Sequence, residues 1–185
     1  MARLNFTELP LKGAYTIDLD KREDDRGFFA RYWCKNEFEE LGLDTNIVQI
    51  NNSLSPQKGS LRGLHYQRPP KAETKIVRCI RGSIWDVIVD IREGSSTYGK
   101  WYSTELNDNN RTMMYVPQGF AHGFQTMVDN VELLYLHSEF YSKEDEGGLL
   151  YNDKEIAIDW PIPVSEISER DKLHPILNEL EPIKL

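Results

Sequence analysis

The sequence contains four histidines, the side chains best suited to proton transfer near neutral pH: His65, His122, His137 and His174. His65 stands in the segment Leu-Arg-Gly-Leu-His-Tyr-Gln at 61–67. If this segment is extended, His65 shares a face with Gly63 and Gln67, and the glycine leaves room for a ligand to approach the imidazole. A proton-transfer role and a role as a hydrogen-bonded histidine of the core or rim both fit this pattern.

His122 has a similar setting, in the segment Val-Pro-Gln-Gly-Phe-Ala-His-Gly-Phe at 116–124. A glycine follows the imidazole directly, so the same two interpretations stay open for this residue.

Metal binding is a further chemistry that these histidines suggest. A metal site built on 61–67 would need a second imidazole, as in His-x-His, but Gln67 occupies that place. His137 and Glu139 have the His-x-carboxylate spacing of non-haem iron sites, although a match of three residues is expected by chance. The two cysteines, Cys34 and Cys79, match no zinc or redox spacing. The sequence therefore favours a site without metal or cofactor.

Cationic residues next to glycine or inside strand-like runs are a second candidate group. Arg26, Arg62 and Lys75 have this setting, and together they could hold a pyrophosphate within an otherwise acidic protein. Each of them could equally be a surface cation or pair with one of the thirty acidic residues. Tyr135 and Tyr141 are also open, since a tyrosine in an apolar run is compatible with a core role.

The elements that position these residues are short runs of β-branched and aromatic residues separated by turn residues. In the segment 84–91, Trp85, Val87 and Val89 lie on one face, while Asp86 and Asp90 lie on the other. This alternation predicts a strand with one apolar and one mixed face. Further strands are predicted over 74–81, 100–106, 111–116 and 131–137. Several such strands favour a β-sandwich or barrel.

Helix signals are few. The segment 35–42 predicts one short helix with Asn36 as its N-cap and Gly42 as its end. The tail over 165–180 predicts one or two short helices broken at Pro175. The class is therefore mostly β with a little helix.

Length and charge limit the functions open to the chain. Its 185 residues fit a single domain over 1–185, and a hydrophobic content of 39% excludes wholesale disorder. With 22 basic and 30 acidic residues the net charge is −8, which argues against a nucleic-acid or membrane-surface partner. There is no signal-like or membrane-spanning apolar stretch, so we expect a soluble, cytoplasmic protein.

Several motifs occur in an order that resembles the dTDP-4-dehydrorhamnose 3,5-epimerase family, from about residue 5 to about residue 175. The motifs are Asp25-Arg-Gly-Phe-Phe29, Val48-Gln-x-Asn51, the segments 61–67 and 116–124, Lys75-Ile-Val-Arg-Cys79, Asp86-Val-Ile-Val-Asp-Ile-Arg92, Tyr151-Asn-Asp153, Ile158-Asp-Trp-Pro161 and Ser168-Glu-Arg-Asp171. Because many motifs match in register, the resemblance is specific.

The resemblance implies a metal-free cupin jelly roll and a homodimer whose N-terminal strands cross to the partner. It implies epimerisation at C3 and C5 of a nucleotide-linked 4-keto-6-deoxy sugar. By this resemblance His65 is the base, Asp171 orients its imidazole, Lys75 stabilises the enolate oxygen, and Tyr135 is the acid on the opposite face.

The same resemblance implies the residues that bind the nucleotide sugar. They are Arg26, Gln49, Asn51, Arg62, His122, Tyr141, Glu146 and Arg170, with Tyr141 stacking on the base. For Gln49 and Glu146, a plain surface or turn role stays open.

The sequence also departs from the family at three positions. Arg31 replaces a common Glu, Ile50 replaces a common Asp, and Arg170 replaces a common Lys. These changes bear on base or sugar preference and leave alternatives open: an epimerase of one carbon, or one that acts on a related dTDP- or CDP-linked sugar. A non-catalytic nucleotide-sugar-binding cupin and a metal-dependent dioxygenase are the rivals from other classes.

Overall fold

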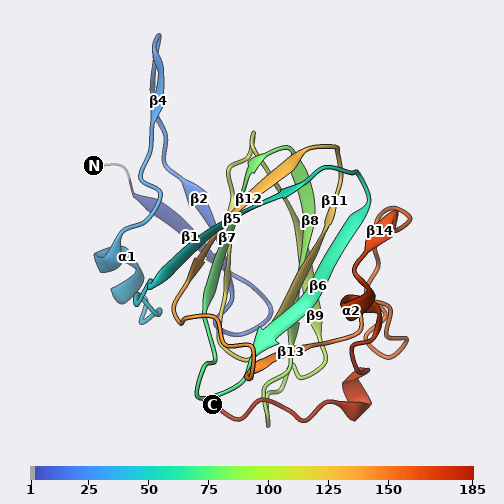
Figure 1. Ribbon diagram of the computed structural model, residues 1–185. Helices are drawn as coiled ribbons and strands as arrows, with labels where there is room; N and C mark the ends of the chain where they lie inside the picture. Colours follow the sequence, from blue (N-terminus) through green and yellow to red (C-terminus); the bar gives the residue numbers. More distant parts are fainter. Residues whose placement is uncertain (1–2) are drawn as a thin grey trace.

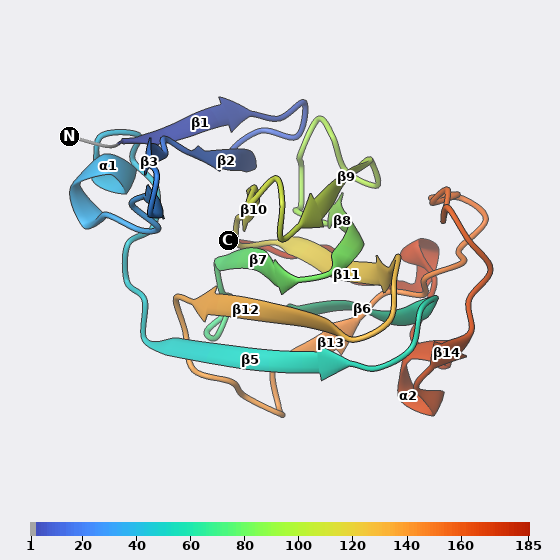
Figure 2. The same cartoon turned by 90° about the horizontal axis from the view of Figure 1, so that it is seen from above.

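The computed structural model describes residues 3–185, which form two antiparallel β-sheets packed face to face. Figure 1 shows the two sheets facing each other, and Figure 2 shows the same layers from above. The mostly β fold class, a jelly-roll sandwich with a few short helices, is confirmed.

The first sheet contains the N-terminal strands, and it also provides one wall of the cavity described in the next subsection. Its strand order is β1-β2-β10-β7-β12-β5. The strands are β1 (Leu4–Glu8), β2 (Tyr15–Leu19), β5 (Gln49–Ser55), β7 (Lys75–Arg81), β10 (Met113–Val116) and β12 (Val131–His137). Strand β5 lies at an edge of this sheet, and Ile50 and Leu54 on it are exposed.

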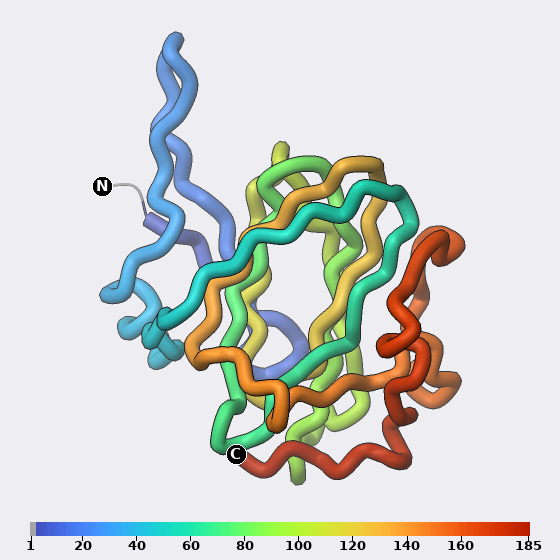
Figure 3. The backbone as a smooth tube through the Cα atoms, viewed as in Figure 1, coloured from blue at the N-terminus to red at the C-terminus, as the bar shows by residue number. Residues whose placement is uncertain are grey.

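The second sheet has the order β13-β6-β11-β8-β9, with β14 paired in parallel to β6. The strands are β6 (Ser60–Gln67), β8 (Ser83–Asp90), β9 (Trp101–Asn107), β11 (Phe120–Thr126), β13 (Glu146–Gly148) and β14 (Glu166–Ile167). A separate two-stranded hairpin, β3 (Arg22–Asp24) and β4 (Gly27–Phe29), projects away from both sheets (Figures 1 and 3).

Strand β8 has the expected apolar face and mixed face, and most of its residues are buried on both. Ile84 and Ile88 belong to the core between the sheets, while Val87 and Val89 pack under the C-terminal segment. That segment runs along the outside of the second sheet (Figure 3). Asp86 lies on the inner side with Ile84 and Ile88, and its side chain is fully buried. The polar residue in this alternation therefore points into the interior of the sandwich and not into solvent.

The structure has the few short helices that the sequence predicts, but the N-cap of the first one is a different residue. Helix α1 (Lys35–Glu39) begins after Cys34, and no side chain caps it, so the prediction of Asn36 as N-cap is wrong. Gly42 does end this turn, with a φ of +67° that favours glycine. In the tail, α2 (Glu169–Lys172) and a 3₁₀ turn (Leu177–Glu179) lie on either side of Pro175, as predicted. Among residues 3–185, none of the helices is long and apolar enough to cross a membrane.

Candidate active site

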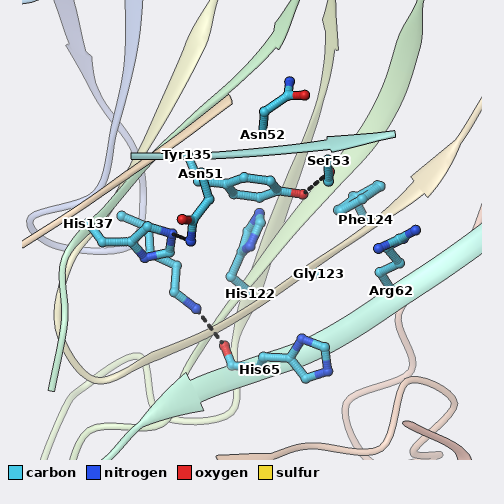
Figure 4. Close-up of a pocket in the computed structure, with 11 residues that line it drawn as sticks. Asn51, Asn52, Ser53, Arg62, His65, His122, Gly123, Phe124, Tyr135 and His137 are labelled. Carbon is cyan, nitrogen blue, oxygen red and sulfur yellow. Dashed lines mark hydrogen bonds between the residues drawn. The ribbon is translucent and has the colours of Figure 1, made fainter. Parts of the chain in front are cut away.

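A cavity of about 290 Å³ opens between the two sheets at one end of the sandwich. Figure 4 shows its lining, which comes from β5, β6, β7, β11 and β12. The lining residues are Asn51, Asn52, Ser53, Arg62, His65, Lys75, His122, Gly123, Phe124, Tyr135 and His137. Polar side chains, some buried and some exposed, converge here from both sheets, which is typical of a small-molecule site.

His65 is held by a carboxylate from the C-terminal segment. Its Nε2 lies 2.8 Å from Asp171 Oδ1, and the Gly63 N–H donates to Asp171 Oδ2 over 3.0 Å. Helix α2 positions this carboxylate, because the Oγ of its N-cap Ser168 accepts the Asp171 N–H over 3.1 Å. With Nε2 donating to Asp171, Nδ1 of His65 is left to accept a proton.

The two members of this pair shift each other's protonation. Burial lowers the pKa of His65, and the charges of Lys75 and Arg170 lower it further, against the opposing effect of Asp171. Burial alone would raise the pKa of Asp171, but contacts with His174, His65 and the Gly63 N–H hold it well below its usual range. A neutral imidazole beside an ionised carboxylate is the state required of a general base.

Tyr135 faces the same cavity from the other sheet. Its hydroxyl lies 3.1 Å from Ser53 Oγ, and burial raises its pKa above the ordinary value for tyrosine, so the hydroxyl keeps its proton. In Figure 4, Tyr135 and His65 lie on opposite sides of the cavity, with His122 between them. A neutral imidazole and a protonated hydroxyl thus approach the cavity from two sides.

Lys75 brings a nearly buried cation to the cavity. Its Nζ lies 3.1 Å from Glu73 Oε1 and 3.4 Å from the His65 carbonyl oxygen. Glu73 also accepts from His137 Nδ1 over 2.8 Å. Burial would raise the pKa of Glu73, but His137 and Lys75 together hold it below its usual range. The carboxylate therefore stays ionised and keeps the ammonium group in place.

His122 is bound to a carboxylate from β8. Its Nε2 lies 2.7 Å from Asp86 Oδ1, and both side chains are buried. Burial raises the pKa of Asp86, and its Oδ2 has no hydrogen-bond partner within residues 3–185. The pair fixes the orientation of His122 in the cavity wall.

Arg62 connects this cavity to a second one of about 350 Å³. Both Arg62 and His65 line the two cavities, and Glu166, Ser168 and Arg170 line the second. In the described part of the chain, Arg62 Nη2 donates to the Leu54 carbonyl oxygen over 3.2 Å and its guanidinium pairs with no carboxylate. Because no carboxylate of residues 3–185 neutralises this guanidinium and it lines both cavities, it can bind an anionic ligand there.

The rim residues form a chain of contacts beside these cavities. Arg170 Nη1 donates to Glu146 Oε2 over 2.8 Å, and the same oxygen accepts from the Tyr141 hydroxyl over 3.0 Å. The Tyr141 N–H points at Gln49 Oε1, 3.4 Å away. Asn51 Nδ2 lies 3.4 Å from His137 Nε2. The structure therefore joins Gln49, Tyr141, Glu146 and Arg170 in one chain of contacts, of which Arg170 lines the second cavity, while Asn51 lines the first.

Arg26 is a predicted site residue that lines neither of these cavities. It lies in the projecting hairpin, pairs with Asp24 and is exposed. Two of the departures from the family also lie outside the cavity lining. Arg31 forms an ion pair with Glu37, and Ile50 is exposed at the edge of the first sheet.

One group of donors lies close enough to share a metal ion within the described residues: His65, Asp171 and His174. Arg170 Nη2 lies 3.1 Å from His65 Nε2, so a cation placed there would meet a fixed positive charge. His137 and Glu139 do not converge, because His137 binds Glu73 while Glu139 binds Lys71.

We expect the chain to keep its activity after removal of metals. Every charge needed for proton transfer is supplied by side chains, and the cation Arg170 lies beside the donor group His65, Asp171 and His174. Turnover before and after exhaustive dialysis against EDTA measures this. A loss of turnover that a divalent metal restores would contradict it.

Asp86, Glu73 and His174 contact the site, although sequence reasoning assigns none of them to it. The alternation of β8 contained a signal for Asp86, since it is a charged residue on an inward face. Glu73 lies in a loop and His174 in an irregular segment, and neither carries a periodic pattern that could reveal its contacts.

The sequence and the fold both match known proteins, and several of the matches share one family name. A sequence profile described as dTDP-4-dehydrorhamnose 3,5-epimerase matches residues 8–179. The dTDP-4-dehydrorhamnose 3,5-epimerase of Methanothermobacter thermautotrophicus is 42% identical over 175 residues, covering 93% of this chain and 94% of the relative.

Two crystal structures have the same fold. That of dTDP-4-dehydrorhamnose 3,5-epimerase from Elizabethkingia anophelis superposes with a TM-score of 0.92 at 42% identity, covering 95% of this chain and 97% of the other. That of dTDP-6-deoxy-D-glucose-3,5-epimerase from Legionella pneumophila, in complex with dTDP-4-keto-L-rhamnose, has a TM-score of 0.92 at 34% identity and covers 99% of both chains.

Proposed function

This chain belongs to the dTDP-4-dehydrorhamnose 3,5-epimerase family, and we propose how its residues carry out that reaction. It is an isomerase that inverts C3 and C5 of dTDP-4-dehydro-6-deoxy-D-glucose to give dTDP-4-dehydro-L-rhamnose. The observation that supports our assignment is the pairing of a carboxylate-bound histidine on one sheet with a protonated tyrosine on the other.

Each inversion begins with removal of a proton from a carbon next to the C4 ketone. His65 takes this proton on Nδ1, and Asp171 stabilises the imidazolium that forms. The electron pair moves into an enolate whose O4 is stabilised by the Lys75 ammonium. Tyr135 then gives its proton to the same carbon from the opposite face, which inverts the centre. Proton exchange with solvent restores both groups for the second carbon.

The direct test follows solvent hydrogen into the sugar. In D₂O, the purified chain should place deuterium at both C3 and C5 of the substrate, and NMR should identify the L-rhamno product. Deuterium at one carbon only would favour a single-carbon epimerase, and a bound but unlabelled sugar would favour a non-catalytic binding protein. The base and acid argue against the latter, since a binding protein needs neither.

The nucleotide portion is proposed to bind across Arg62, toward the rim of Arg170, Glu146 and Tyr141. Arg62→Ala should weaken binding more than it slows the chemistry, because its guanidinium would contact the pyrophosphate. A charge-assisted contact contributes about 1.5–3 kcal/mol, so the Kd should rise roughly tenfold to a hundredfold. Calorimetry with dTDP measures this, and an unchanged Kd would remove Arg62 from the phosphate site.

We also propose that one domain over residues 1–185 forms a homodimer in which the β3–β4 hairpin serves the partner's cavity. Phe28 and Phe29 on this hairpin are 42% and 74% exposed, which is unusual for large apolar side chains without a partner surface. Arg26 lies on the same hairpin and is not among the residues that line the cavity of its own chain.

Two inactive variants should therefore complement each other. Chains with Arg26→Ala and chains with His65→Ala, unfolded together and refolded, should regain about one quarter of wild-type activity, because half of the dimers are mixed and each has one intact site. Refolding of each variant alone is the control. No recovery in the mixture would contradict the exchange of Arg26 between subunits.

A further inference from the structure

A third ionisable side chain lies against the carboxylate of the His65–Asp171 pair. His174 Nε2 is 3.4 Å from Asp171 Oδ1, the same oxygen that His65 Nε2 contacts at 2.8 Å. The two imidazole rings are 5.6 Å apart and nearly perpendicular. One carboxylate oxygen is thus approached by two histidines.

His174 is seated in this position by the backbone around it. Gly148 of β13 is the register partner of His65, and a Cβ at Gly148 would overlap the His174 ring. Pro175, the residue that follows His174, is also held in place, because its carbonyl oxygen accepts the Leu150 N–H over 2.9 Å. A glycine opposite His65 therefore leaves the space that the second imidazole fills.

The environment leaves His174 Nε2 little choice of partner. This atom is buried and makes no hydrogen bond within residues 3–185, while the side chain as a whole is 13% exposed. A buried polar nitrogen without a partner is costly, and Asp171 Oδ1 is the acceptor that lies beside it.

We infer that His174 is a positioning residue for the Asp171–His65 pair, which shares the charge of Asp171 and so keeps His65 free to accept a proton. This role rests on the proposed function of His65 as the base. His174 is not among the residues that line the cavity, so it acts through the carboxylate.

The sign of the effect follows from the charges around His65. Lys75 of β7 and Arg170 of α2 bring positive charge, Asp171 brings negative charge, Glu146 of β13 is paired with Arg170, and His122 is the register partner on β11. Among these, Asp171 favours the imidazolium. Without His174, the full charge of Asp171 would act on His65, and the pKa of His65 would rise.

The test is the pH dependence of kcat/KM between pH 5 and pH 9. His174→Leu should move the acidic limb of this profile to higher pH by about 0.5–1 pH unit. At the acid end kcat/KM should therefore fall roughly threefold to tenfold, while at pH 8 it should stay within about twofold of the wild-type value. His174→Gln places an amide N–H near the position of Nε2 and should keep the wild-type limb.

Leu173→Ala is the matched control, because Leu173 is the neighbouring residue and is 82% exposed. Should His174→Leu not fold, His174→Asn removes the same contact with a smaller polar side chain and should move the limb equally. If the acidic limb of His174→Leu does not move, or if kcat/KM falls equally at every pH, the inference is wrong. The proposed function would still stand in that case, provided that the wild type is active. A wild type without turnover would overturn both.

Discussion

Replacing His65 by alanine should abolish both solvent exchange and inversion at C3 and C5. Without the imidazole no group on this side of the cavity can remove the proton, so no enolate forms. General-base catalysis contributes about 10²–10⁴-fold to a rate, and we expect a loss of at least this size. Deuterium incorporation measured by NMR, beside the rate of product formation, checks both steps.

Asp171→Asn provides a graded control for this result. The amide can still hold the ring but supplies no charge, so the variant should resemble a weakened His65→Ala. Free exchange of deuterium in His65→Ala, with an unchanged thermal unfolding curve, would show that another residue is the base.

Replacing Tyr135 by phenylalanine should separate exchange from inversion. His65 and Lys75 remain, so the enolate still forms, but it can be reprotonated only from the face that the proton left. The sugar should therefore take up deuterium and keep its configuration, while inversion falls by about 10²–10⁴-fold.

The matched control is Tyr115→Phe, since Tyr115 is a buried tyrosine of the first sheet whose hydroxyl accepts the Asp44 N–H, and it does not line the cavity. It should invert like the wild type. Inversion at the wild-type rate in Tyr135→Phe would remove Tyr135 from the role of acid.

The strands that the sequence predicts are β7, β8, β9, β10 and β12, which are runs rich in β-branched and aromatic residues. Burial alone does not decide which strands are predicted. Strand β9 lies at an edge of the second sheet and only Leu106 in it is buried, yet it is predicted. Strand β11 is buried along its whole length but is not predicted, because a strand buried on both faces shows no alternation. The exposed hairpin β3–β4 is missed for the opposite reason, since exposure also removes the alternation on which such a prediction depends.

The site could be predicted only in part for a related reason. His65, Lys75 and Tyr135 lie on strands, and the family resemblance assigns them roles that alternation alone leaves open. Contacts across a long separation in sequence, such as that of His65 with Asp171 or of His122 with Asp86, depend on how the sheets pack. No local pattern contains that information.

The close approach of β6 and β11 has a consequence for protein design. A Cβ at Gly63, whose φ is +110°, would lie 2.7 Å from the His122 carbonyl oxygen, and one at Gly123 would lie 2.7 Å from that of Arg62. Transplanting His65, Lys75, Tyr135 and Asp171 onto another sandwich would therefore not transplant the enzyme. The recipient scaffold would also need glycines in two neighbouring strands, at positions where the two backbones approach each other closely.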